Sequence, residues 1–143
     1  MDELIVYLEL VRITAKQLHY SEKGDSFYGN HLLMDKISEE LYDFEDEIIE
    51  SIFMADTGEP PNLSDIYSDI APKILKNPSK TDLLDLLKRT IYFVEEKANE
   101  DRFQGDLDLL GRISNNLRQS YGLLSRVCSK DAGIKHNHKE DGE

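Results

Sequence analysis

The sequence contains no tryptophan, only four prolines and a single cysteine among its 143 residues. One cysteine excludes an intrachain disulfide and any zinc site built from several thiolates. We therefore expect a reducing, cytoplasmic setting. Cys128 itself is expected to be passive, because no arrangement of histidine or asparagine in the sequence suggests an activated thiol.

Basic residues are scarce, with 17 lysines and arginines against 29 acidic residues and a formal net charge of -12. Such a chain repels nucleic acid phosphates and anionic lipid surfaces, whereas it attracts cations. We therefore do not expect DNA as a partner. The N-terminus, "MDELIVYL", has no lysine, and Lys135 and Lys139 stand close to acidic residues of the C-terminal segment.

Long apolar runs are also missing. Charged residues interrupt the N-terminal "MDELIVYLELVRITAKQLH", which therefore predicts neither a signal peptide nor a membrane-spanning helix. A Walker loop, a dinucleotide fingerprint and a His-Glu-x-x-His motif are absent from the sequence as well. Phosphate-transfer, nicotinamide-dependent and metalloprotease functions therefore have no support.

Apolar residues recur at helical intervals through most of the chain, and strand signals are nearly absent, which predicts an all-α protein. Four long helices are expected over residues 3–20, 26–55, 79 or 81 to 99, and 103 or 106 to 127, with a short helix over 63–71. The loop "DTGEPPN" precedes the short helix, and Pro72 ends it. The expected fold is an up-down four-helix bundle with a long central connection.

Residues 1–128 are expected to form this single domain. The ending, residues 129–143, has mixed charge and few apolar residues, and it predicts a disordered tail. His136 and His138 lie in this tail. They are left out of the predicted site because a mobile segment gives metal ligands little preorganisation.

Four polar residues of the predicted second helix fall on one stripe. With His31 at zero on a helical wheel of about 100° per residue, Asp35, Asp46 and Glu50 lie at about 40°, 60° and 100°. Acidic residues on one face of a helix often mark only its solvent-exposed side. Here a separate charged wedge, at about 80–180°, already supplies that side, and the core stripe begins about 200° from His31 and extends to about 300°. The wedge comprises Lys36, Glu39, Glu40, Asp43 and Glu47, and the core stripe Leu33, Ile37, Leu41, Phe44, Ile48 and Ile52.

The His31 stripe shares its angles with Tyr28, Tyr42, Ile49 and Phe53. Carboxylates among such apolar residues need a partner. Asp35 and Asp46 are about 16 Å apart along a straight helix, so one chain cannot bring both to the same ion.

Two copies that cross antiparallel near Glu40 and Leu41 would bring the His31 and Asp35 end of one helix to the Asp46 and Glu50 end of the other. The resulting oxygen and nitrogen donors suit Fe(II), with manganese or zinc as competitors. His19, at the end of the first helix, can supply a second imidazole.

The spacing of His19, His31, Asp35, Asp46 and Glu50 resembles the ferroxidase pattern of the Dps family, the miniferritins. In that family a histidine in "LHW" is followed by a glycine-containing turn, a second histidine, and an Asp-x3-Glu on the same helix. Here the first element is "LHY" and the turn is "SEKGDSFYGNH", with Gly24 and Phe27 in matching places. The resemblance covers the first two helices closely and the rest only as helix order.

The resemblance implies a ferritin-like four-helix bundle and a hollow dodecameric shell with iron sites at each dimer interface. Asp46 and Glu50 of one subunit would bind one iron together with His19 of the two-fold partner, and His31 and Asp35 of that partner would hold a second iron. The implied chemistry is oxidation of Fe(II), preferably by hydrogen peroxide, and storage of ferric mineral, which protects against oxidative damage.

Two positions depart from the family pattern. Tyr20 stands where the family often has tryptophan, and Ser51 where an arginine commonly follows the glutamate, so redox detail and local ion pairing are expected to differ. Tyr20 and Tyr42 are candidate local electron donors. The Glu-x-x-His pairs of ordinary ferritins are missing from the sequence, which argues against a di-iron centre inside one bundle.

Acidic residues near the start of the fourth helix have two interpretations. In Dps-like shells, acidic residues in this region line pores that admit iron, and Asp108 is then the best candidate. Favourable interaction with the helix dipole explains Asp101, Asp106 and Asp108 almost as well. A second functional hypothesis for the whole chain is a non-enzymatic Dps-like helical assembly or binding module that holds a structural metal or none.

Overall fold

The computed structural model describes residues 1–128 and residue 134. Over this part of the chain all regular structure is helical, so the prediction of an all-α fold is confirmed. The predicted tail, with His136 and His138, lies outside the described residues except for Ile134. The helices are α1 (Asp2–Ser21), α2 (Phe27–Ile48), η1 (Ile49–Thr57), α3 (Leu63–Ile70), η2 (Ala71–Lys73), α4 (Lys80–Ala98) and α5 (Gln104–Val127).

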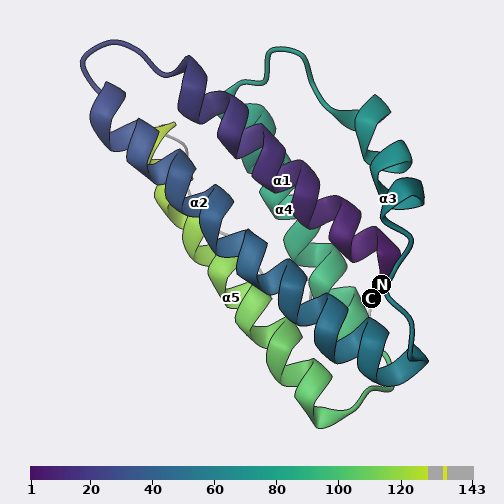
Figure 1. Cartoon of the computed structure of the whole chain (residues 1–143). Helices are drawn as coiled ribbons and strands as arrows, with labels where there is room; N and C mark the ends of the chain where they lie inside the picture. Colours follow the sequence, from purple (N-terminus) through teal and green to yellow (C-terminus); the bar gives the residue numbers. More distant parts are fainter. Residues whose placement is uncertain (129–133, 135–143) are drawn as a thin grey trace, which may run out of the picture.

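Four long helices pack side by side as a bundle (Figure 1). Helix α1 contacts α2 and α4, and α5 contacts α4 and α2. The connection from α2 to α4 returns along the length of the bundle and carries α3, which packs against α1 (Figure 1). Because of this crossover, α2 and α4 run in the same direction. None of the helices in the described part is long and apolar enough to cross a membrane.

The core forms where the apolar stripes predicted a buried face. The four predicted core residues of α1 and the four of α4 are all buried, namely Leu4, Leu8, Val11 and Leu18, and Leu83, Leu87, Ile91 and Val94.

The buried face of α2 differs from the predicted one. Leu33 and Phe44 are only half-buried, whereas Met34, Ser38 and Glu45 are buried. On the helical wheel this moves the buried face by roughly 40° toward His31. The reason is tertiary: α2 packs against both α1 and α5, and the direction between these neighbours sets which face is covered.

Local signals account for the helix ends. Ser79 caps α4 through a capping box, in which its Oγ accepts from the Asp82 N–H at 3.1 Å and its own N–H donates to the Asp82 carboxylate at 2.8 Å. Of the two predicted caps, Ser79 rather than Thr81 therefore begins the helix. Between α1 and α2, Gly24 has a φ of 91°, a left-handed conformation that favours glycine. This short turn places the end of α1 beside the start of α2.

The second long helix is not α-helical to its end. The sequence predicts an α-helix to about residue 55, but from Ile49 to Thr57 the backbone forms a π-helix, which Gly58 ends with a φ of 76°. A π-helix bonds each residue to one five positions away, so its turns are wider and each residue advances by a smaller angle. Glu50 therefore lies closer in angle to Asp46 than an ideal α-helical wheel predicts.

Candidate metal centre

His19 and His31 lie against each other where α1 and α2 meet. His19 Nδ1 is 2.7 Å from the carbonyl oxygen of His31, and His31 Nδ1 is 2.8 Å from the carbonyl oxygen of His19. The two rings are stacked, with centroids 3.5 Å apart and an interplanar angle of 20°. The twelve-residue separation of the two histidines in the sequence therefore closes into direct contact through the Gly24 turn.

The reciprocal hydrogen bonds determine which nitrogen is free. A carbonyl oxygen can only accept, so each Nδ1 must carry the hydrogen and donate it. In a neutral imidazole the other nitrogen, Nε2, then keeps its lone pair. Metal-binding histidines are oriented by this kind of outer hydrogen bond to a backbone carbonyl. Both Nε2 atoms are therefore available as ligands.

Aromatic rings flank the histidine pair on both sides. Phe27 stacks on His31 with centroids 4.9 Å apart, and Tyr20 meets the His19 ring edge-on at 5.2 Å. The Tyr20 side chain itself is 72% exposed. These contacts, together with the two hydrogen bonds, limit rotation of the imidazoles and hold their orientation.

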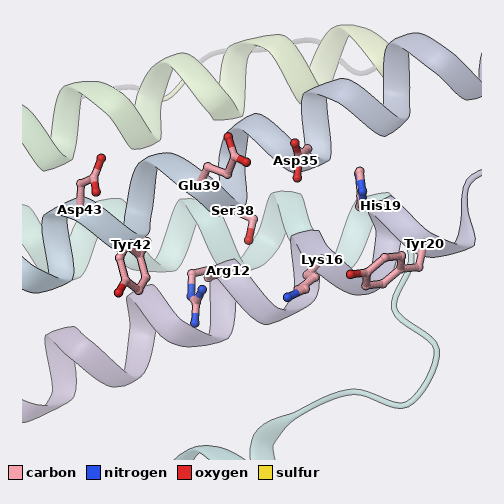
Figure 2. A pocket seen from close by; sticks show the side chains of 9 residues that line it. All are labelled: Arg12, Lys16, His19, Tyr20, Asp35, Ser38, Glu39, Tyr42 and Asp43. Carbon is pink, nitrogen blue, oxygen red and sulfur yellow. The ribbon is translucent and has the colours of Figure 1, made fainter.

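A groove of about 490 Å³ runs between α1 and α2 beside this pair. Figure 2 shows His19 and Tyr20 at one end of the groove, with Asp35 projecting from α2 near them. Arg12 of α1 lies over the Tyr42 ring of α2, 5.5 Å from its centroid. The other lining residues are Lys16, Ser38, Glu39 and Asp43. The groove therefore offers an imidazole and a carboxylate together at its His19 end.

Asp46 and Glu50 do not join this group. Both are exposed and lie beyond the groove, toward the far end of the second long helix. Asp46 is about 16 Å along the helix from Asp35. Among the residues that the structure describes, a single chain contains no group of three or more histidine, cysteine or acidic residues able to hold a metal ion. The predicted ligands of one chain are thus divided between two separate places.

Several large apolar side chains of α1 and the second long helix face solvent in a single chain, and two of them, Tyr20 and Tyr42, line the groove. Tyr20, Tyr28 and Tyr42 are 72%, 71% and 52% exposed. Leu32, at 48%, and Met54, at 51%, are further exposed apolar side chains of the same long helix. Apolar patches of this kind are typical of surfaces that another protein covers.

Two buried carboxyl groups were missed by the sequence reasoning. Glu9 of α1 and Glu45 of α2 are only 3% and 7% exposed, and the two carboxyl groups lie close enough to interact. Burial, strengthened by the contact with Glu9, raises the pKa of Glu45 to about 10. With this raised pKa, Glu45 is protonated and neutral at neutral pH, which avoids burying a second negative charge beside Glu9.

The Glu9 carboxylate has two further partners, a guanidinium group and a hydroxyl group. Arg12 lies 3.2 Å from Glu9, and the Tyr67 hydroxyl donates to Glu9 at 3.4 Å. Tyr67 belongs to α3, so this group also links the crossover to the bundle. The wheel itself gave a signal for Glu45, which falls at about 320°, between the core stripe and His31.

Asp108, the candidate pore residue, has a partner within the chain. Its carboxylate accepts from Arg112 at 3.2 Å, and Arg112 also forms two hydrogen bonds with Glu47 of α2, at 2.9 and 3.0 Å. Asp106 is buried at the start of α5. Asp108 is thus part of an exposed ion-pair group between α5 and α2, and its proposed place in a pore stays a prediction.

No model of a known protein family matches the chain, and no curated protein matches it in sequence. The functional argument therefore depends on the geometry of the residues themselves.

Proposed function

We propose that this chain is a Dps-like miniferritin with a ferritin-like fold, which oxidises Fe(II) at sites shared between two-fold-related subunits and stores ferric mineral in a hollow dodecameric shell. The observation that carries the proposal is the His19–His31 pair, whose reciprocal hydrogen bonds leave both Nε2 atoms free. A merely structural histidine pair does not require Asp35 beside it, nor two further carboxylates at the spacing of Asp46 and Glu50.

Division of the ligands within one chain supports a shared site. His19, His31 and Asp35 would come from one subunit, and Asp46 and Glu50 from the second. If two α2 helices cross antiparallel about a two-fold axis, the ligands at one end of each helix meet those at the other end of its partner. This arrangement produces two equivalent sites. The exposed apolar surface around Tyr28 and Tyr42 gives such a crossing an area to bury.

The donor set suits the substrate. Imidazole nitrogen binds Fe(II) well, and carboxylate oxygens are anionic donors whose attraction grows with the charge of the ion. Fe(III) is therefore stabilised relative to Fe(II) at such a site, which favours oxidation. Hydrogen peroxide takes one electron from each of two Fe(II) ions and, with two protons, becomes two water molecules. This stoichiometry avoids the one-electron cleavage that produces hydroxyl radical.

The fold and charge are compatible with this role. A four-helix bundle with one long crossover connection is the connectivity of ferritin-like proteins. The formal charge of -12 attracts cations to the molecule. A cytoplasmic location, expected from the single cysteine, belongs to the same proposal.

The test is to add Fe(II) anaerobically to the purified protein, then hydrogen peroxide, and to follow ferric absorbance together with particle mass by light scattering. We expect fast peroxide-dependent oxidation and a soluble iron-loaded particle, both lost in His31→Ala with Asp35→Ala. Glu39→Gln is the matched control, because Glu39 lines the same groove but is not a proposed ligand.

An intact assembly that oxidises iron no faster than buffer would overturn the ferroxidase proposal. It would favour the second hypothesis, a non-enzymatic Dps-like assembly or binding module. A monomeric protein would contradict the shared site altogether.

A further inference from the structure

A second groove, of about 790 Å³, lies on another part of the bundle, between α1, α4 and the crossover segment that contains η2. Its volume falls in the range of small-molecule sites, about 300–1,000 Å³. None of its lining residues lines the α1–α2 groove. Any ligand it holds is therefore separate from the proposed iron chemistry.

Apolar side chains from α1, α4 and the crossover segment line part of this groove. Val6 and Leu10 of α1 and Leu86 of α4 form part of the core, yet they keep 6%, 9% and 8% of their surface accessible. Leu75 of the crossover also lines the groove, although 48% of its surface is exposed. Apolar surface that remains in contact with water at a concave site favours a ligand with an apolar body.

Five charged residues line the groove, and one ion pair neutralises two of them, whereas Asp82 is hydrogen-bonded but keeps its negative charge. Lys73 forms an ion pair with Asp69 at 3.0 Å, and the Asp82 carboxylate accepts from the Ser79 N–H in the capping box. Arg89 is exposed and, within the described part of the chain, makes no hydrogen bond or ion pair. A guanidinium group beside apolar side chains is the residue type that binds a carboxylate through two parallel hydrogen bonds.

We infer that this groove binds a small amphipathic carboxylate, with its apolar chain on Val6, Leu10 and Leu86 and its carboxylate on Arg89. Glu3 is the remaining carboxylate at the rim without a partner in the described residues. It opposes an anionic ligand, so its charge limits the affinity. The inference does not depend on the proposed ferroxidase activity.

The probe is decanoate, titrated calorimetrically into the full-length assembled protein below the micellar concentration of the probe. We expect saturable binding that weakens about tenfold or more in Arg89→Gln, because a charge-assisted hydrogen bond is lost. Lys88→Gln is the matched control, since Lys88 is the exposed neighbour on α4 and does not line the groove. Glu3→Gln should tighten binding, and decanol should bind more weakly than decanoate.

Absence of saturable decanoate binding to the unmodified protein would overturn the inference, as would equal affinity in Arg89→Gln and Lys88→Gln. Circular dichroism melting of each variant verifies that the fold is kept. The rate of iron oxidation should be the same in Arg89→Gln as in the unmodified protein. Failure of the carboxylate site can therefore be distinguished from failure of the ferroxidase proposal.

Discussion

His19 Nδ1 and His31 Nδ1 each hydrogen-bond the backbone carbonyl of the other residue, at 2.7 and 2.8 Å. The exchange fixes the tautomer of both rings before any ion arrives. It also couples the end of α1 to the start of α2, so the position of one possible ligand depends on that of the other.

The first prediction concerns this tautomer. In the metal-free protein, at a pH where both rings are neutral, His19 and His31 should carry their hydrogen on Nδ1. Nitrogen-15 spectra that correlate ring nitrogens with ring carbon-bound protons distinguish the two tautomers directly. Hydrogen on Nε2 of either ring would contradict the proposed ligand arrangement. Addition of Zn²⁺ should shift the Nε2 signals much more than the Nδ1 signals.

The second prediction tests whether the site is shared between subunits. His31→Ala with Asp35→Ala removes one half of every site, and Asp46→Ala with Glu50→Ala removes the other half. Each double variant alone should oxidise iron no faster than buffer. Co-assembly of equal amounts should restore about a quarter of the wild-type rate, because half of the dimers are mixed and one of their two sites is intact.

Matched mixtures provide the control for that experiment. Either double variant co-assembled with wild-type protein should retain activity. This result would show that co-assembly itself does not abolish iron oxidation. If the two double variants together recover no activity although mass measurements show mixed dimers, the ligands do not combine across the interface.

The third prediction follows from the buried Glu45. Its pKa is about 10 in the folded protein, against about 4.3 in an unfolded chain. Below about pH 4 both states are protonated and the group contributes nothing. Above that pH the unfolded chain releases a proton that the folded protein keeps, so the free energy of unfolding falls as the pH rises toward 10.

Glu45→Gln should remove this loss of stability at higher pH. The free energy of unfolding of the variant should exceed that of the unmodified protein by an amount that increases with pH, at up to about 1.4 kcal/mol per pH unit. Urea unfolding at several pH values between about 5 and 9, at constant protein concentration, measures the difference. Glu39→Gln, an exposed change on the same helix, should show no such trend. A difference that does not vary with pH would mean that Glu45 is ionised in the folded protein.

The fourth prediction concerns the start of α4. Ser79→Ala removes the capping hydrogen bond to the Asp82 N–H and should lower the free energy of unfolding by about 1 kcal/mol. Thr81→Ala, at the other predicted cap, should have a smaller effect, since Ser79 is the residue that caps the helix. Iron oxidation should be unchanged in both. Equal destabilisation by the two substitutions would argue against the capping box.

Much of the fold could be predicted from local patterns. Apolar spacing predicts the helix at Asp2–Ser21 to within one residue at each end, and spacing together with a cap predicts α4. The Gly24 turn was recognised from glycine in a polar segment. The candidate ligands were selected in the same way, because the residues of one helical face can be read from sequence intervals.

The rotation of α2 could not be predicted, and for this reason the burial of Glu45 was missed. A periodic pattern gives the order of residues around a helix, but the neighbouring helices decide which face is covered. Glu45 lies between the apolar stripe and His31, so a rotation of roughly 40° transfers it from the boundary to the interior. The π-helical turns at Ile49–Thr57 likewise have no simple sequence signal.

Sequence patterns are sufficient to predict the helical class, the helix order, the turn at Gly24 and the intervals between His19, His31, Asp35, Asp46 and Glu50. These features depend on interactions between residues close in the chain. The hydrogen bonds between His19 and His31, and the burial of Glu45 beside Glu9, depend instead on the tertiary structure. Contacts of this kind depend on how α1 and α2 lie against each other, and that arrangement is set by the packing of the whole bundle.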